Sequence, residues 1–333
     1  MHAAAFSPRG GVAHKTTCPR GQSIIEYVLI IAVIGLVIVF AGPGVAGAIR
    51  NQFNLIGNTV NNGTTDGVEG GVSGGGSTGA DSATVQAAVA KDAKDWTLDE
   101  QKAVAEDIAK NGISSLAYAK TKAAMDAHTV WEITLANNEV MDYAIIGINH
   151  DDLADGSGKA GLTFLTVTPY ITSRMNATGT NAGGWEKSEL RAKMNSGEIW
   201  NLMPPEFRSK VKPVRKLTNN VGGGDANKNA AVTATTDRLF PLSNSEIVEA
   251  PYDEWLDWSW IGNEGTRYEA FNNMSENGFE DDDTLWANLW FERTSSPEAD
   301  DEFLKMYSLA GSDSYITDYA SNEDAVICPA FCF

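Results

Sequence analysis

The clearest hydrophobic pattern is a single uninterrupted apolar run near the start of the chain. The 23 residues from Tyr27 to Ile49 carry no charge. At about 1.5 Å per residue this run is long enough for one helix across a membrane. Gly42-Pro43-Gly44 should kink or end the first helical run. We therefore predict a long hydrophobic, membrane-spanning helix within residues 22–56.

The residues before this run set its predicted orientation. Residues 1–21, the leader that precedes the apolar helix, contain Arg9, Lys15 and Arg20 and no acidic residue. Cationic flanks stay on the cytoplasmic side, so everything after Arg50 should be exported. A plain signal peptide fits less well, since its apolar core would be shorter and would end in a small-x-small cleavage site. The predicted location is the cell membrane, in contact with lipid, with an extracellular C-terminal domain.

One carboxylate, Glu26, stands at the entrance of the apolar helix, where a charge is costly in a bilayer and therefore points to a function. The segment from Gly21 to Tyr27 resembles the processing site of type IV prepilins, particularly the Flp-type (tight-adherence) subclass. The resemblance implies that a prepilin peptidase cuts after Gly21 and leaves Gln22 as the new N-terminus. It also implies that Glu26 pairs with the N-terminal ammonium of a neighbouring pilin subunit, and Tyr27 is characteristic of the subclass.

This resemblance covers about the first sixty residues and has one departure. Flp pilins usually end soon after the helix, whereas this chain continues to residue 333. The alternative is a simple membrane anchor, with Glu26 near the headgroups and no role in assembly.

Beyond the helix the pattern predicts a linker and then a short helical segment. Residues 57–81 are rich in Gly, Asn, Thr and Ser, which is typical of a flexible linker. Residues 82–128 should form two or three helices, as a stalk or as a lid on the next domain. Val85 and Val89 share one face, and Thr97 with Glu100 forms a capping box. A third helix should open at Ser114 or Ser115.

From residue 129 to 333 the spacing of hydrophobic residues alternates between that of strands and that of helices, which predicts a mixed domain. Alternation over 130–135 and 141–148 around Asn137-Asn138 predicts a β-hairpin. Further strands are predicted at Leu162–Thr168, Arg238–Leu242 and Ala325–Phe333, with helices over Trp185–Asn195 and from Pro205. The rest reads as irregular. The predicted fold class is α+β: the hydrophobic helix, the Gly-rich linker, the helical segment, then a loop-rich mixed α/β domain.

A second resemblance covers about Trp131 to Phe333. This region resembles a bacterial domain family of unknown function that recurs in exported proteins of Gram-positive bacteria. The resemblance implies a C-type-lectin-like or sulfatase-modifying-factor-like layout, in which terminal strands pair and long loops cover a small sheet. It implies no catalytic residues. The segments that carry it are Asn149–Gly156, Gly184–Arg191, Lys216–Asn220, Leu239–Ser243 and Pro329–Phe333.

Charge narrows the possible partners. The net charge is −19, and loss of the three leader cations would make it −22, which argues against binding to nucleic acid. Residues 246–302 hold 17 Asp and Glu against Arg267 and Arg293 alone. Such a run is usually a solvated face, with cation binding or docking of a basic partner as the alternative.

Candidate catalytic and metal-binding residues are sparse. His150 beside Asp151 and Asp152 is compatible with a metal cluster, but a His in this place more often just ends a strand. The series from Asp151 to Gly156 only partly matches a calcium loop, because its third and twelfth positions are leucine. We therefore predict no catalytic residue, no metal site and no cofactor, with calcium as the one candidate ion.

The cysteines add little chemistry. Cys18 lies in the leader, and Cys328 and Cys332 lie four residues apart around Pro329. In one extended strand their Cα atoms would be about 13 Å apart, too far for a disulfide unless the proline bends the chain. We expect both thiols to be buried as small apolar groups.

Three classes of function follow. The first is a pilin-like subunit of a surface pilus, or a surface-displayed protein, that carries a globular adhesion domain for an unknown extracellular ligand. The second is a monomeric, membrane-anchored binding module without filament assembly. The third, an extracellular enzyme related to sulfatase-modifying factors, fits less well because both cysteines fall at a strand end. We therefore expect no enzymatic activity.

Overall fold

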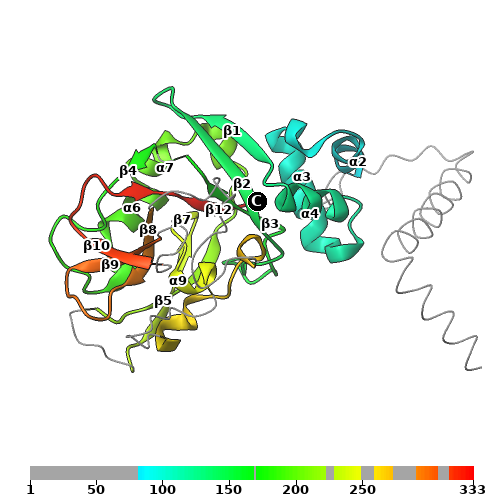
Figure 1. The fold of residues 1–333 in the computed structure, drawn as a ribbon. Coiled ribbons are helices and arrows are strands. Elements are labelled where there is room, and N and C mark those ends of the chain that lie inside the picture. The colour runs from blue at the N-terminus through cyan, green and yellow to red at the C-terminus, as the bar shows by residue number, and fades with distance from the viewer. Residues whose placement is uncertain (1–81, 169, 223–228, 249–258, 273–289, 307–314) are drawn as a thin grey trace, which may run out of the picture. The chain divides into compact units, whose positions relative to one another are not determined.

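The computed structural model describes residues 82–168, 170–222, 229–248, 259–272, 290–306 and 315–333 (Figure 1). The leader, the apolar helix and the linker lie outside these residues, and so do Gly21, Gln22, Glu26 and Tyr27. Within the described part of the chain, no helix combines the length and the apolar character needed to cross a bilayer.

Three helices open the described chain, joined by short 3-10 turns: α2 Ser82–Ala90, η1 Ala93–Asp95, α3 Leu98–Asn111, η2 Gly112–Ser114 and α4 Tyr118–Asp126. The predicted capping box of α3 is confirmed. The Glu100 amide donates to Thr97 Oγ1 at 3.3 Å, and the Thr97 amide donates to Glu100 Oε2 at 2.7 Å. The predicted start of α4 is wrong, because Ser115 Oγ instead accepts from the Ala117 amide at 3.0 Å, ahead of the helix.

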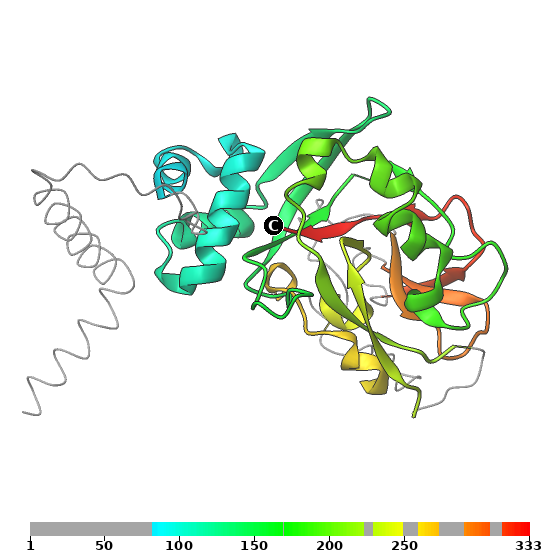
Figure 2. The same cartoon turned by 180° about the vertical axis from the view of Figure 1, so that it is seen from behind.

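These helices pack on the sheet. Val85, Val104 and Ile108 are buried in the same apolar cluster as Trp131 and Tyr143 of the hairpin, and in both views the helices lie beside the β1–β3 edge (Figures 1 and 2). At one contact, a Cβ added to Gly161 would lie only 1.8 Å from the Ala105 carbonyl oxygen. Residues 82–128 therefore form a layer packed on the sheet of the domain that follows, which is compatible with the second of the two predicted roles, a lid on that domain.

The central sheet has the strand order β1-β2-β3-β12-β7, with every pairing antiparallel. The predicted hairpin is confirmed, with Trp131 opposite Tyr143. The last strand, β12, pairs with β3 and with β7, not with β1. The strand bounds are β1 Val130–Thr134, β2 Val140–Ile148, β3 Leu162–Thr166, β7 Leu239–Phe240 and β12 Ala330–Cys332.

Three smaller antiparallel sheets surround this one. Two of them, the β5–β6 hairpin and the β8–β9–β10 sheet, fall where the sequence pattern gave no strand. The predicted terminal strand is also interrupted, because Pro329 separates β11 from β12. The bounds are β4 Ile171–Thr172, β5 Val214–Asn219, β6 Val232–Asp237, β8 Trp290–Ser295, β9 Glu302–Met306, β10 Tyr315–Tyr319 and β11 Val326–Ile327.

Short helices complete the domain: α5 Gly184–Lys187, α6 Glu189–Asn195, α7 Glu198–Leu202, α8 Pro205–Arg208, α9 Asn244–Ile247, η3 Ser259–Glu264 and η4 Glu269–Phe271. The helix predicted over Trp185–Asn195 is divided at Ser188. The Ser188 hydroxyl accepts from the Arg191 amide at 3.1 Å and so caps α6. Leu190 and Met194 are buried, as the spacing predicts.

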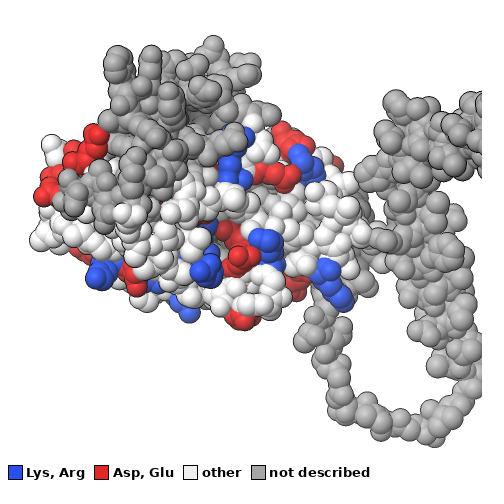
Figure 3. All heavy atoms as spheres, turned by 90° about the horizontal axis from the view of Figure 1, so that it is seen from below, with Lys and Arg blue, Asp and Glu red and all other residues white. Residues whose placement is uncertain are grey.

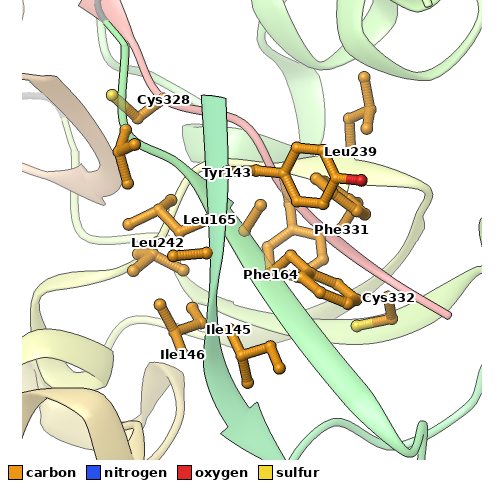
Figure 4. Packing of buried hydrophobic residues seen from close by; sticks show 14 of the residues in the cluster. Tyr143, Ile145, Ile146, Phe164, Leu165, Leu239, Leu242, Cys328, Phe331 and Cys332 are labelled. Atoms are coloured by element: carbon orange, nitrogen blue, oxygen red, sulfur yellow. The ribbon is translucent and has the colours of Figure 1, made fainter. Parts of the chain in front are cut away.

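Aromatic side chains fill the core between the central strands. The Phe164 and Phe331 rings stack at 5.2 Å, and Tyr143 meets Phe331 edge-on at 5.3 Å. Figure 4 shows these rings converging, with Cys328 and Cys332 well separated. Both cysteines are buried and free, so the prediction of two unbridged, buried thiols is confirmed.

Candidate functional site

Five ionisable or hydroxylic side chains meet in the interior beside the central sheet. We call this set the charged network. Each comes from a different element, and all are at least nine-tenths buried: Asp151, Lys216, Glu246, Tyr268 and Arg293. Burying charge costs free energy unless partners replace the lost water, so their pairing decides whether this arrangement is stable.

Lys216 lies at the centre of the network. It sits on β5, and its Nζ is 2.7 Å from Asp151 Oδ1 and 2.5 Å from Glu246 Oε1. The ammonium also lies 4.3 Å from the centre of the Phe240 ring. One buried cation is thus shared between two carboxylates.

Asp151 follows β2 in a tight turn. Its backbone is fixed by the Ala160 amide, which donates to the Asp151 carbonyl at 2.8 Å. Two hydroxyls donate to its carboxylate: Tyr268 Oη to Oδ2 at 2.9 Å and Thr163 Oγ1 to Oδ2 at 2.6 Å. This carboxylate is held by one cation and by neutral donors.

Glu246 is placed by a second capping box. It is the third residue of α9, and its Oε2 accepts from the Ser243 amide at 3.1 Å. The same oxygen accepts from Arg293 Nη1 at 2.6 Å. Arg293, on β8, uses its remaining donors on the backbone carbonyls of Leu217, Pro241 and Glu264. All of its guanidinium nitrogens therefore have partners.

Two glycines leave room for the network. A Cβ on Gly147 would lie 2.8 Å from Tyr268 Cδ1. A Cβ on Gly265 would lie 2.7 Å from Glu246 Oε1, and Gly265 has φ +153°, which side chains disfavour. Larger residues at these positions would displace the Tyr268 ring or the Glu246 carboxylate.

Two more buried carboxyl groups lie next to the network. Glu264 accepts from the Asn219 amide at 2.8 Å and from the Thr294 hydroxyl. Glu292 accepts from Asn244 Nδ2 at 3.3 Å, while its Oε2 has no hydrogen-bond partner in the described structure. Burial raises the pKa of Glu264 to about 7 and the pKa of Glu292 well above its usual value.

The paired carboxylates behave in the opposite way. Burial opposes their ionisation, but the Lys216 ammonium and His150 hold the pKa of Asp151 well below its usual value. Arg293 and Lys216 likewise lower the pKa of Glu246 against its burial. While Glu264 and Glu292 are protonated, the charged network has no net charge, because its two carboxylates match the Lys216 and Arg293 cations.

The residues weighed as a metal cluster have other partners. The His150 ring lies tilted against that of Tyr268, with 3.9 Å between the ring centres, and Asp152 pairs with Lys159 at 3.0 Å, while Asp151 belongs to the charged network. His150 does follow the end of β2. Among the described residues, no three His, Cys, Asp or Glu side chains are arranged to hold a metal ion.

The thiols are poor nucleophiles. Burial raises the pKa of Cys328 to about 12 and the pKa of Cys332 well above its usual value. A reactive cysteine requires a thiolate. Cys332 Sγ instead lies beside Thr163 Oγ1 at 3.4 Å, at the edge of the charged network.

Sequence reasoning located parts of this network without assembling it. Asp151, Lys216 and Cys332 all fall in segments that carry the second resemblance, and so does Ser243, which caps α9. Another of these segments supplies Trp185 and Arg191, which hold the buried carboxylate of Asp237 at 3.0 and 2.7 Å. The signal that could have revealed the network is a charged residue at a position where the alternation of a strand predicts a buried side chain, as at Lys216 of β5.

The surface shows a different use of charge. On the face seen in Figure 3, the blue and red side chains of the described residues lie close to one another. Most of the acidic residues of 246–302 lie outside the described ranges. The described surface pairs include Lys122 with Asp126 and Arg174 with Glu323.

The fold and the network define a mixed α/β globular domain with an internal, balanced set of charges. By its match over residues 160–333, just over half of the chain, the protein belongs to the family described as domain of unknown function DUF6273. This confirms the expected relation to a family of unknown function, although the match begins after the hairpin and Asp151. Neither a prepilin family nor a lectin-like family was found for the chain, and no curated protein or solved structure matches it.

Proposed function

We propose that this protein is a pilin-like subunit, or a surface-displayed protein of that kind, that carries its mixed α/β domain outside the cell for adhesion. The observation that carries the proposal is the order of residues at the N-terminus: Gly21, Gln22 and Glu26 directly before the apolar run that starts at Tyr27. A lone acid at the entrance of an apolar helix is costly unless it finds a cationic partner. The N-terminal ammonium of a neighbouring processed subunit is such a partner.

The described domain is compatible with a binding role. Its clustered ionisable groups are paired and internal, and its two thiols are buried with a raised pKa. Both features argue against the sulfatase-modifying-factor-like enzyme, which would need an accessible, ionisable cysteine. We also propose a lectin-like layout, based on the small sheet and the long connections around it. The ligand would then be bound by these loops, outside the charged network.

N-terminal sequencing and one substitution test this function. The surface-exposed protein should begin at Gln22, and Glu26→Ala should leave expression unchanged while removing the chain from sheared surface filaments. Glu139→Ala, which changes an exposed glutamate in the hairpin turn, is the matched control and should assemble normally. A mature chain that begins elsewhere would contradict the proposal. Filaments that contain Glu26→Ala at the wild-type level would instead favour the monomeric anchor.

A further inference from the structure

The centre of the charged network brings an amine and two carboxyl groups into hydrogen-bond distance. Lys216 Nζ lies 2.7 Å from Asp151 Oδ1 and 2.5 Å from Glu246 Oε1. The three side chains are 3%, 3% and 2% exposed. The centre therefore holds an amine, an acceptor carboxyl group and a second acid, which together are the components of an acyl transfer.

We propose that Lys216 and Asp151 condense within the folded domain to form an isopeptide bond between their side chains, with Glu246 as the proton shuttle. The inference is a covalent modification of the domain itself. It does not depend on the proposed role in filaments, because it uses residues of the described domain alone.

The surroundings distinguish the two carboxyl groups. Glu246 is bound by the Arg293 guanidinium at 2.6 Å, which holds it as a carboxylate, a poor electrophile that can still take up a proton briefly and pass it on. Asp151 is bound by hydroxyls, from Tyr268 at 2.9 Å and Thr163 at 2.6 Å on the same oxygen. These two donors would stabilise negative charge on Oδ2 when the carbon becomes tetrahedral. Asp151 is therefore the acceptor.

The step balances without another reactant. The Lys216 ammonium passes one proton through Glu246 to the Asp151 carboxylate, which gives a neutral amine beside a neutral acid. Nζ then attacks Cγ, the atom bonded to Oδ1, and a new N–C bond forms. The second proton leaves Nζ through Glu246 to the departing oxygen, the C–O bond breaks, and one water molecule is released. The product is a neutral amide.

The buried position favours this product. An ammonium and a carboxylate held away from water are costly even when paired, and condensation removes both charges. Glu246 and Arg293 remain as a balanced pair. Phe240 and Tyr268, whose ring centres lie 4.3 and 5.5 Å from Nζ, shield the site from water that would reverse the reaction. Fixing amine and acid in contact also removes the entropic cost of bringing them together.

The bond would join two parts of the fold that are separate in sequence. Asp151 and Lys216 are 65 residues apart. The link would fasten the turn after β2 to β5, and so the central sheet to the β5–β6 hairpin. A cross-link across a loop of this length restricts the unfolded chain in the way a disulfide does. Unlike a disulfide, it would not be cleaved by thiol reductants.

Peptide mapping of the denatured, protease-digested full-length chain tests the proposal. Wild type should yield one branched peptide that joins Asp151 to Lys216 and is lighter than its two parts by one water molecule. Asp151→Asn should give the same branched product with loss of ammonia, and Asp151→Ala should give none. Glu246→Gln should slow the appearance of the link by about a hundredfold or more. Lys305→Met, which removes a different lysine–aspartate pair, should leave the link unchanged.

Each contrary outcome is decisive. Folded wild-type protein, judged by near-ultraviolet circular dichroism, that yields only free Asp151 and Lys216 peptides would overturn the proposal. A branch from Lys216 to Glu246 would overturn the choice of acceptor. A link that forms in Glu246→Gln at the wild-type rate would overturn the role of Glu246. Asp151→Asn and Glu246→Gln nearly preserve side-chain shape, so the test does not depend on the more disruptive alanine variant.

Discussion

Gly265 packs against the carboxylate of Glu246 at the heart of the charged network. Its φ of +153° is disfavoured for any side chain, and a Cβ there would meet Oε1 at 2.7 Å. Moving the carboxylate would lengthen its contacts with Lys216 and Arg293, which are 2.5 and 2.6 Å in the native arrangement. Because Gly265 has no side chain, Glu246 can keep its ion pairs with Lys216 and Arg293.

Gly265→Ala should therefore destabilise the domain by about 1–3 kcal/mol from backbone strain alone. The measurement is the urea midpoint of the full-length protein. Gly262→Ala is the matched control, because its Cβ would meet nothing within 4 Å and its φ is not in the positive range. Equal midpoints for the two variants would show that the space around Glu246 does not matter.

At the scale of elements, helix α3 and strand β3 meet in an unusually close backbone contact. Gly161, just before β3, lies so close to α3 that a Cβ would overlap the Ala105 carbonyl oxygen at 1.8 Å. Backbone faces backbone here, so no flexible side chain is available to move aside. The close approach of α3 to the sheet at this point requires glycine.

Gly161→Ala should push α3 away from the sheet, at a cost of about 1–3 kcal/mol from overpacking. Backbone amides of α3 should then exchange hydrogen faster, while those of the distant β8–β9 pair stay protected. Gly179→Ala, whose Cβ would make only an ordinary 3.7 Å contact with Asp301 Cβ, should leave both regions unchanged. Unaltered protection of α3 in Gly161→Ala would mean that the helices do not depend on this contact.

The same scale shows what could be predicted from sequence. The capping box of α3 and the β1–β2 hairpin are determined by residues close together in the chain, so their patterns were sufficient. Strands β5 and β8 were missed because they hold Lys216, Glu292 and Arg293, which a pattern treats as surface residues. Their partners lie far along the chain: Arg293 meets Glu246 across 47 residues and the Leu217 carbonyl across 76. No local signal encodes such pairings.

The candidate site was predictable only in pieces for the same reason. The resembling segments contained Asp151 and Lys216, but nothing in either segment indicates that the two meet. The sequence also could not show what lies beside Asp151, where a metal cluster with His150 was weighed and not predicted. A lysine from β5 occupies the place beside Asp151 that a metal ion would need.

At the scale of the whole molecule, the charged network and the two carboxyl groups beside it hold more acid than base. Asp151, Glu246, Glu264 and Glu292 face Lys216 and Arg293, all buried. The charges of this set are balanced only while Glu264 and Glu292 keep their protons. Their balance therefore depends on pH, which links the folding stability of the domain to proton binding.

Stability should consequently fall as the pH rises through the neutral range. The pKa of Glu264 is raised from 4.5 to about 7 on folding, so the folded state holds this proton more tightly than the unfolded chain does. The stability that this proton provides is complete below about pH 4.5 and is lost as the pH rises toward 7, a change of about 3 kcal/mol at 1.36 kcal/mol per pH unit. Glu292, whose pKa is also raised, extends the loss to higher pH.

Glu246 works in the opposite direction, since its lowered pKa means that its stabilising charge is lost in strong acid. The domain should thus be most stable in mildly acidic solution. Urea unfolding from pH 5 to 8 measures how far its free energy of unfolding falls above that optimum. Glu264→Gln keeps the shape and removes the proton, so its stability should change by about 3 kcal/mol less over this range. Parallel pH profiles for wild type and Glu264→Gln would mean that Glu264 is not the group that titrates. A loss shared by both proteins would then be assigned to Glu292 or to the surface carboxylates.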